Sequence, residues 1–179
     1  MPEAAIPKED VPHPAESDLC LECGMCCDNT MFGRVVVEED EARTIRGLGI
    51  EIIEYDDGEL SFNQPCPRLC DKKCQVYESR PWTCESYVCE TIKDLRRGDI
   101  FANEAQARIE TVLGAKAALA KQAGDADLFE YRNAVTDAIE GGEPPSAIPN
   151  CTPELVRLET LLNRWFRTED YAKKVPEEG

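Results

Sequence analysis

Histidine is almost absent from this chain. The 179 residues include a single histidine, His13, which lies between Pro12 and Pro14 in a segment with no hydrophobic pattern. A Ser-His or Cys-His catalytic pair needs a histidine beside its nucleophile, and a mixed Cys/His zinc site needs a histidine ligand. We therefore expect neither hydrolytic catalysis nor such a zinc site, and we leave His13 out of any site.

Positive charge and long apolar runs are also scarce. Twenty Lys and Arg residues stand against 36 Asp and Glu, for a formal net charge of -16, whereas nucleic-acid binding depends on cationic contacts to phosphate. No stretch approaches the ~20 apolar residues of a membrane span, and the start, MPEAAIPKEDVPHPAESD, has no apolar core of a secretory signal. We expect a cytoplasmic protein that binds neither nucleic acid nor membrane.

Cysteine, in contrast, is abundant and clustered. Nine of the ten cysteines fall between positions 20 and 89, and the run opens with a CxxCxxCC array. In a reducing compartment, clustered cysteines are metal ligands or redox groups more often than disulfides. We predict a metal site of zinc or iron, with these candidate ligands: Cys20, Cys23, Cys26, Cys27, Cys66, Cys70, Cys74, Cys84 and Cys89.

The spacing leaves several ligand groupings open. Three cysteines spaced as CxxCxxC can bind one centre, and in bacterial ferredoxins a remote Cys-Pro supplies the fourth ligand, which Cys66-Pro67 could provide here. Cys27 directly follows Cys26, and adjacent side chains diverge, so a second metal is implied. Cys27 with Cys74, Cys84 and Cys89 would make a second set of four. A polynuclear zinc cluster with bridging thiolates is the other arrangement.

The remaining cysteine and the nearby cations have other predicted roles. Cys151 precedes the helix N-cap Thr152, where we expect a small buried apolar side chain packed on Val156 and not a ligand. Arg68, Lys72, Lys73 and Arg80 lie between the later cysteines. Arg80, fixed by the proline that follows it, is the best candidate to offset thiolate charge.

The rest of the pattern predicts an α+β fold. We expect a flexible tail over residues 1–18, a cysteine-cluster domain over 19–90 and a helical region over 91–175. The middle part should hold a strand (31–37), a short helix (38–46) and a hairpin (50–55 with 60–62) turning at Asp57-Gly58, then loops and single helical turns around metal (64–90). Helical spacing joins Ile109, Val112, Leu113, Lys116, Ala117 and Ala120. Asp127 with Glu130, and Thr152 with Pro153, mark two further helix starts.

The full cysteine pattern resembles a known family. It runs Cys20-x-x-Cys23-Gly24-x-Cys26-Cys27, then Cys66-Pro67-x-Leu69, then Cys74-Gln75-Val76-Tyr77-Glu78-x-Arg80-Pro81, then Cys84 through Tyr87 to Cys89. This is similar to the CxxCxxCC, or YkgJ-type, cysteine-cluster family. The resemblance covers residues 20 to 89 and implies a zinc- or iron-chelating domain. The family's eight cysteines map onto all of the candidates above except Cys70, which this chain adds, and Glu85 stands where an arginine is usual.

Two functions follow from the residues and the resemblance together. One is a metal-binding protein whose zinc or iron is structural or serves metal or redox handling, with the helical region covering the site or docking a protein partner. The alternative is an iron-sulfur protein for electron transfer or protein modification, which the CxxCxxC array with a remote Cys-Pro favours. Flagellin lysine N-methylases carry related cysteine patterns, which implies an enzymatic relative. No glycine-rich nucleotide loop accompanies the cysteines, which argues against methyl transfer here, and we leave catalysis open.

Overall fold

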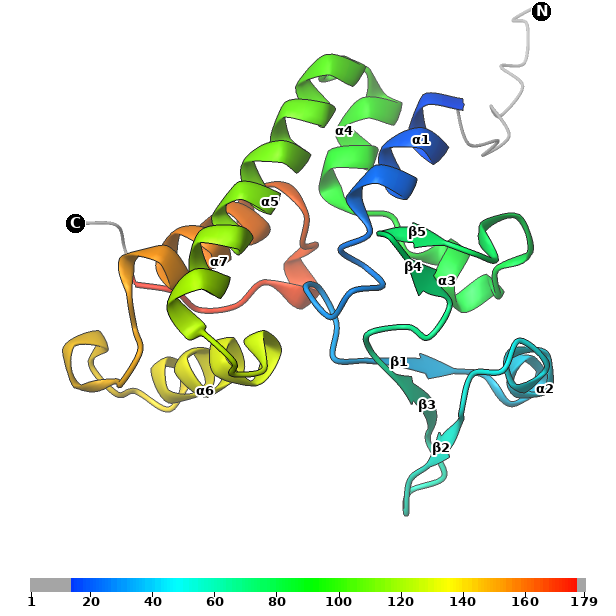
Figure 1. Cartoon of the computed structure of the whole chain (residues 1–179), viewed down its shortest axis with the longest axis horizontal. Helices are drawn as coiled ribbons and strands as arrows, with labels where there is room; N and C mark the ends of the chain where they lie inside the picture. Colours follow the sequence, from blue (N-terminus) through cyan, green and yellow to red (C-terminus); the bar gives the residue numbers. More distant parts are fainter. Residues whose placement is uncertain (1–13, 177–179) are drawn as a thin grey trace, which may run out of the picture.

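The computed structural model describes residues 14–176, so His13 and most of the predicted tail lie outside the described part. The fold is α+β, as predicted, with a cysteine-rich N-terminal part and a helical C-terminal part (Figure 1). Helix α1 (Pro14–Cys23) begins inside the segment predicted as a tail and carries the first two cysteines. None of the described helices is long and apolar enough to cross a membrane.

A small three-stranded antiparallel sheet follows the first cysteine array. Its strands are β1 (Arg34–Val37), β2 (Ile53–Glu54) and β3 (Leu60–Asn63), in the order β1-β3-β2. The predicted hairpin is confirmed. Its turn closes through a bond from the Glu59 backbone N–H to Asp57, 3.0 Å long, and Gly58 adopts a φ of 84°. Helix α2 (Glu39–Gly47) packs on this sheet, and the two share a core of Val37, Ile45, Ile50 and Phe62.

The cysteine-rich connection after β3 consists of short elements. Strands β4 (Leu69–Cys70) and β5 (Lys73–Cys74) pair in a tight hairpin, with positive φ at both turn residues, Asp71 and Lys72. A 3₁₀ turn, η1 (Tyr77–Ser79), and the five-residue helix α3 (Trp82–Ser86) complete the connection. The prediction of loops and single helical turns therefore holds, apart from the unpredicted β4–β5 hairpin.

Four helices form the C-terminal part: α4 (Glu90–Arg97), α5 (Ala102–Ala123), α6 (Leu128–Glu140) and α7 (Pro153–Trp165). Two more 3₁₀ turns, η2 (Pro145–Ala147) and η3 (Glu169–Tyr171), flank α7. The predicted N-caps are confirmed, because Asp127 accepts from the Glu130 N–H and Thr152 accepts from the Leu155 N–H. Helix α5 contacts α1, α4, α6 and α7, so it is the centre of this part (Figure 1).

The predicted inner face of α5 is partly wrong. Its buried residues are Ala105, Ile109, Val112, Ala115 and Leu119, whereas Ala117 and Ala120 are exposed. These buried side chains join residues of α7 and the first cysteine segment, including Met25 and Met31, in the main hydrophobic core. The cysteine array and the helical part are therefore packed together.

A buried ion cluster joins α6 and α7 to the first cysteine segment. Glu159 is fully buried and accepts bonds from Arg132 Nε (2.5 Å) and Arg167 Nη1 (2.6 Å). Burial alone would raise the pKa of Glu159, but the two guanidiniums outweigh it and lower the pKa. Arg132 also donates to the Thr30 carbonyl (3.0 Å). The cluster thus fixes the chain just beyond the cysteine array.

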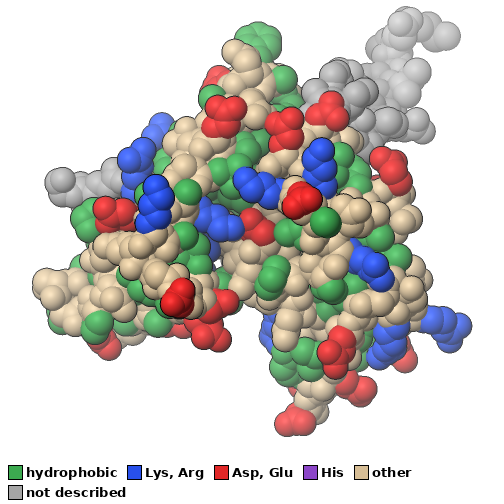
Figure 2. Space-filling view, in the orientation of Figure 1, with side chains coloured by type: hydrophobic (Ala, Val, Ile, Leu, Met, Phe, Trp, Pro, Cys, Tyr) green, Lys and Arg blue, Asp and Glu red, His purple; other side chains and the backbone are tan. Residues whose placement is uncertain are grey.

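The surface carries charges of both signs. Figure 2 shows Asp and Glu side chains spread over both the helical part and the hairpin side of this face, interspersed with Lys and Arg. Some of these charges are paired across elements. Lys116 of α5, for example, bonds Asp28 in the first cysteine segment at 2.6 Å.

Candidate metal centre

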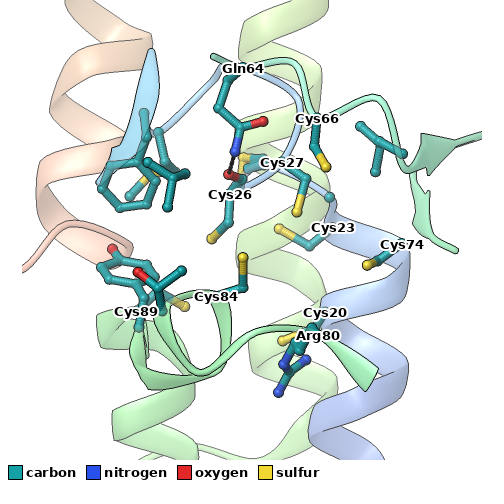
Figure 3. A pocket seen from close by; sticks show the side chains of 18 of the residues that line it. Cys20, Cys23, Cys26, Cys27, Gln64, Cys66, Cys74, Arg80, Cys84 and Cys89 are labelled. Carbon is teal, nitrogen blue, oxygen red and sulfur yellow. Dashed lines mark hydrogen bonds between the residues drawn. The ribbon is translucent and has the colours of Figure 1, made fainter. Parts of the chain in front are cut away.

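Eight cysteines line one cavity of about 560 Å³. They come from segments far apart in the sequence, namely α1 and the turn after it, the connection after β3, β5, α3 and the start of α4 (Figure 3). The set is Cys20, Cys23, Cys26, Cys27, Cys66, Cys74, Cys84 and Cys89. All ten cysteines are free thiols. The donor set is therefore sulfur alone, which suits zinc, iron or an iron-sulfur cluster.

Gly24 shapes the first array. It ends α1 with a φ of 65°, and its carbonyl accepts from the backbone N–H groups of Cys27 (2.9 Å) and Asp28 (3.1 Å). A Cβ at Gly24 would lie 2.8 Å from the Lys72 carbonyl oxygen. A glycine here therefore permits both the left-handed turn and the close approach of the β4–β5 hairpin, which carries Cys74.

The connection after β3 is fastened directly to the first array. The backbone N–H of Cys66 donates to the Cys27 carbonyl at 2.8 Å, and Gln64 Nε2 donates to the Cys26 carbonyl at 3.3 Å. These bonds fix Cys66 beside Cys27. Nothing in the sequence pattern singled out Gln64, whose role depends on where the hairpin docks.

The hydrophobic surroundings divide the cysteines into two neighbourhoods. Cys23, Cys26 and Cys89 pack against the main core of the helical part. Cys66 and Cys84 pack against the separate small core under the sheet. The aromatic rings of Phe32, Tyr87 and Tyr171 meet edge to face beside the first neighbourhood, with centroids 4.8 to 6.0 Å apart.

Burial controls the protonation of these thiols. It raises the pKa of Cys23, Cys27, Cys84 and Cys89 to about 12 and that of Cys26 well above its usual 9.0. The thiols are therefore protonated at neutral pH, and a metal ion must displace their protons.

The thiolate charges that add to burial follow the same division, apart from that of Cys27, which also raises the pKa of the adjacent Cys26. Among neighbouring thiolates, that of Cys89 acts most on Cys23 and Cys26. For Cys27, the neighbouring thiolates that raise its pKa belong to Cys74, Cys66 and Cys84. The thiol of Cys84 is likewise affected by Cys66 and Cys74.

Cys70, the ninth predicted ligand, is not brought to the cavity. It is exposed, and its sulfur lies 3.9 Å from an Asp71 carboxylate oxygen. Cys74 pairs with Leu69 across the β4–β5 hairpin, whereas Cys70 pairs with Lys73, and neighbouring pairs point to opposite faces. Cys151 is half-buried against the main core, outside the cavity lining.

The sulfurs face the same space without being drawn tightly together. Within residues 14–176, no group of three or more His, Cys, Asp or Glu side chains is arranged closely enough to hold one ion. Four cations were considered from the sequence. Arg68 donates to the Leu48 carbonyl, Lys73 is exposed, and both Arg80 and the exposed Lys72 line the cavity.

Comparison with known families agrees with this chemistry. The family model CxxCxxCC, described as "Putative zinc- or iron-chelating domain", matches residues 19–108, about half of the chain. The matched segment contains all eight cavity cysteines and extends through α4 into α5. No curated protein and no solved structure matches the chain.

Proposed function

The chain belongs to the CxxCxxCC family of zinc- or iron-chelating domains, and we propose that it binds two metal ions, each through four cysteine thiolates. The first set is Cys20, Cys23, Cys26 and Cys89. The second set is Cys27, Cys66, Cys74 and Cys84. Cys70 belongs to neither set.

The observation that carries this proposal is the division of the cysteines into two neighbourhoods. Cys23, Cys26 and Cys89 share one apolar core, and Cys66 and Cys84 share the other. The thiols raise one another's pKa within the same groups, and the one effect across them is that of Cys27 on the adjacent Cys26. Cys20 joins the first set because its thiolate adds to the raised pKa of Cys23 and Cys89.

The adjacent pair Cys26-Cys27 supplies one ligand to each set. Because neighbouring side chains on a backbone diverge, this pair is better suited to two ions than to one. The Cys66 N–H bond to the Cys27 carbonyl keeps the second set together from the backbone side. The proposal departs from the ferredoxin-like grouping expected from the sequence in one exchange, with Cys89 in place of Cys66.

The metals would act first as structural elements. The core under the sheet contains four buried residues, so it contributes little stability to the cysteine-rich connection. Closing four thiolates around an ion in each set would supply the missing stabilisation. The first set packs against the main core, so its ion would also tie residues 19–90 to the helical region.

A second candidate is an iron-sulfur cluster in the first set. Three cysteines spaced as CxxCxxC with one remote cysteine match the ligand pattern of a cubane cluster, and this set lies against apolar side chains. A cluster there would indicate a redox role, in electron transfer or in a protein-modifying, methyltransferase-like enzyme.

Metal analysis of protein purified without oxygen and without added metal tests both candidates. Two zinc or two iron ions per chain, with no inorganic sulfide, would support the proposal. About four iron with matching sulfide and a broad visible band would favour the cluster instead. Protein that holds no metal under these conditions, and takes up none when zinc or iron is added, would overturn both.

A further inference from the structure

Arg80 lines the cavity that the two cysteine sets share. It follows η1 and precedes Pro81, which holds it in an extended conformation (φ -64°, ψ 147°) at the entry to α3. Its guanidinium carbon sits 4.0 Å from the centroid of the Tyr77 ring, a cation–π stack that fixes the side chain. Figure 3 shows the guanidinium directly beside Cys20.

One nitrogen atom of this guanidinium lacks a hydrogen-bond partner. Arg80 Nε is buried and has no hydrogen-bond partner among the described residues, which is costly for a charged donor. Cys20 and Tyr77 line the same cavity as Arg80. A protonated thiol is a weak acceptor, whereas a metal-bound thiolate accepts from a guanidinium readily.

The charge of Arg80 also lies near both sets. Arg80 lines the cavity together with Cys20 of the first set and with Cys84 of the second, which lies four residues further along the chain in α3. Four thiolates around a divalent ion leave two excess negative charges, which nearby donors and cations must offset. Arg80 is placed to do so for either set.

We propose that Arg80 is a positioning residue for the metal centre: its Nε–H donates to the Cys20 thiolate once the first ion is bound, and its charge offsets that of both sets. This role rests on the proposed two-site function. It is confined to the loaded protein, because the acceptor for Nε forms only when the ion displaces the thiol proton.

The test compares zinc release from the loaded protein into an excess of chelator for the natural chain, Arg80→Gln, Arg80→Lys and the control Arg43→Gln. Arg43 is an exposed residue of α2, so this control removes the same charge away from the cavity. We expect Arg80→Gln to release both ions about 10- to 100-fold faster. Arg80→Lys keeps the charge but loses Nε and the planar stack, so it should accelerate mainly the ion of the first set. Arg43→Gln should match the natural chain.

A second readout separates positioning from a purely structural role. The urea midpoint of the metal-free protein should fall only slightly in Arg80→Gln, because the variant loses the stack on Tyr77 but no hydrogen bond of Nε. Unchanged zinc release, or a metal-free protein that loses as much stability as the loaded one or fails to fold, would overturn the role of Arg80 while leaving the two-site proposal standing. A natural chain that binds no zinc would instead overturn the two-site proposal itself.

Discussion

Gly24→Ala should destabilise the protein through two effects. One is backbone strain at Gly24, and the other is a clash with the β4–β5 hairpin, which carries Cys74. The glycine has a φ of 65°, and an added Cβ would lie 2.8 Å from the Lys72 carbonyl oxygen. The left-handed conformation costs alanine about 1–2 kcal/mol. The contact is with backbone, so relieving it must move the β4–β5 hairpin, at a further cost of about 1–3 kcal/mol. We expect the free energy of unfolding to fall by about 2–5 kcal/mol in total.

Gly58→Ala is the matched control. Gly58 also has a positive φ, 84°, but a Cβ added there would point into open space, with no contact within 4 Å. It should lose only the conformational cost of about 1–2 kcal/mol. Urea unfolding of the loaded proteins gives both values, and chelator competition should show weakened metal binding for Gly24→Ala alone. Equal losses in the two variants, with unchanged metal binding, would refute the proposed contact between the first array and the hairpin.

Three further predictions concern the ligand set, the thiols and the buried ion cluster. Cys70→Ser should leave the metal content unchanged in elemental analysis, since its sulfur lies outside the cavity; loss of an ion would contradict this. Because burial raises the pKa of Cys23, Cys27, Cys84 and Cys89 from 9.0 to about 12, the folded metal-free protein binds more protons than the unfolded chain between these values. Its stability in urea should therefore hold below pH ~9 and fall as the pH rises towards ~12, whereas metal affinity should rise with pH because ligation releases protons; a metal-free protein that gains stability there would contradict the burial of these thiols. Glu159→Gln should cost about 3–5 kcal/mol in urea unfolding, because it leaves two buried guanidiniums without their carboxylate, while Glu140→Gln at the exposed end of α6 should cost little; equal effects would contradict the buried cluster.

Local chemistry explains the parts of the fold that could be predicted from the sequence. The Asp57-Gly58 turn and the Asp127 and Thr152 caps each depend on residues within three positions of one another. Helix α1 lacks such a signal, since its apolar residues form no stripe. It is supported instead by tertiary contacts, with Leu19 in the main core and Glu16 paired with Arg96 of α4 at 3.1 Å.

The α5 face was misjudged for a related reason. Alanine fits an exposed or a buried position equally well, so the spacing of Ala117 and Ala120 could not distinguish their exposed face from the buried one that holds Ala115 and Leu119. The true face is decided by packing against α7 and the first cysteine segment.

The candidate site shows the same limit. Clustering and spacing predicted nine cysteine ligands, because dense CxxC patterns have few other uses, and eight of the nine line the cavity. Their neighbours could not be predicted, because Cys66 meets Cys27 only through the docking of the connection after β3. The position of Cys70 depends on the register of a two-residue hairpin, which pairs it with Lys73 on the face away from the cavity.

The most direct test of two separate sites removes two cysteines at a time and counts the metal ions left by native mass spectrometry. Cys26→Ala with Cys89→Ala disables the first set, and Cys66→Ala with Cys84→Ala disables the second. Each double variant should retain one tightly bound ion per chain, and the quadruple variant should retain none. Loss of both ions from either double variant would contradict two independent four-cysteine sites and indicate a single shared cluster.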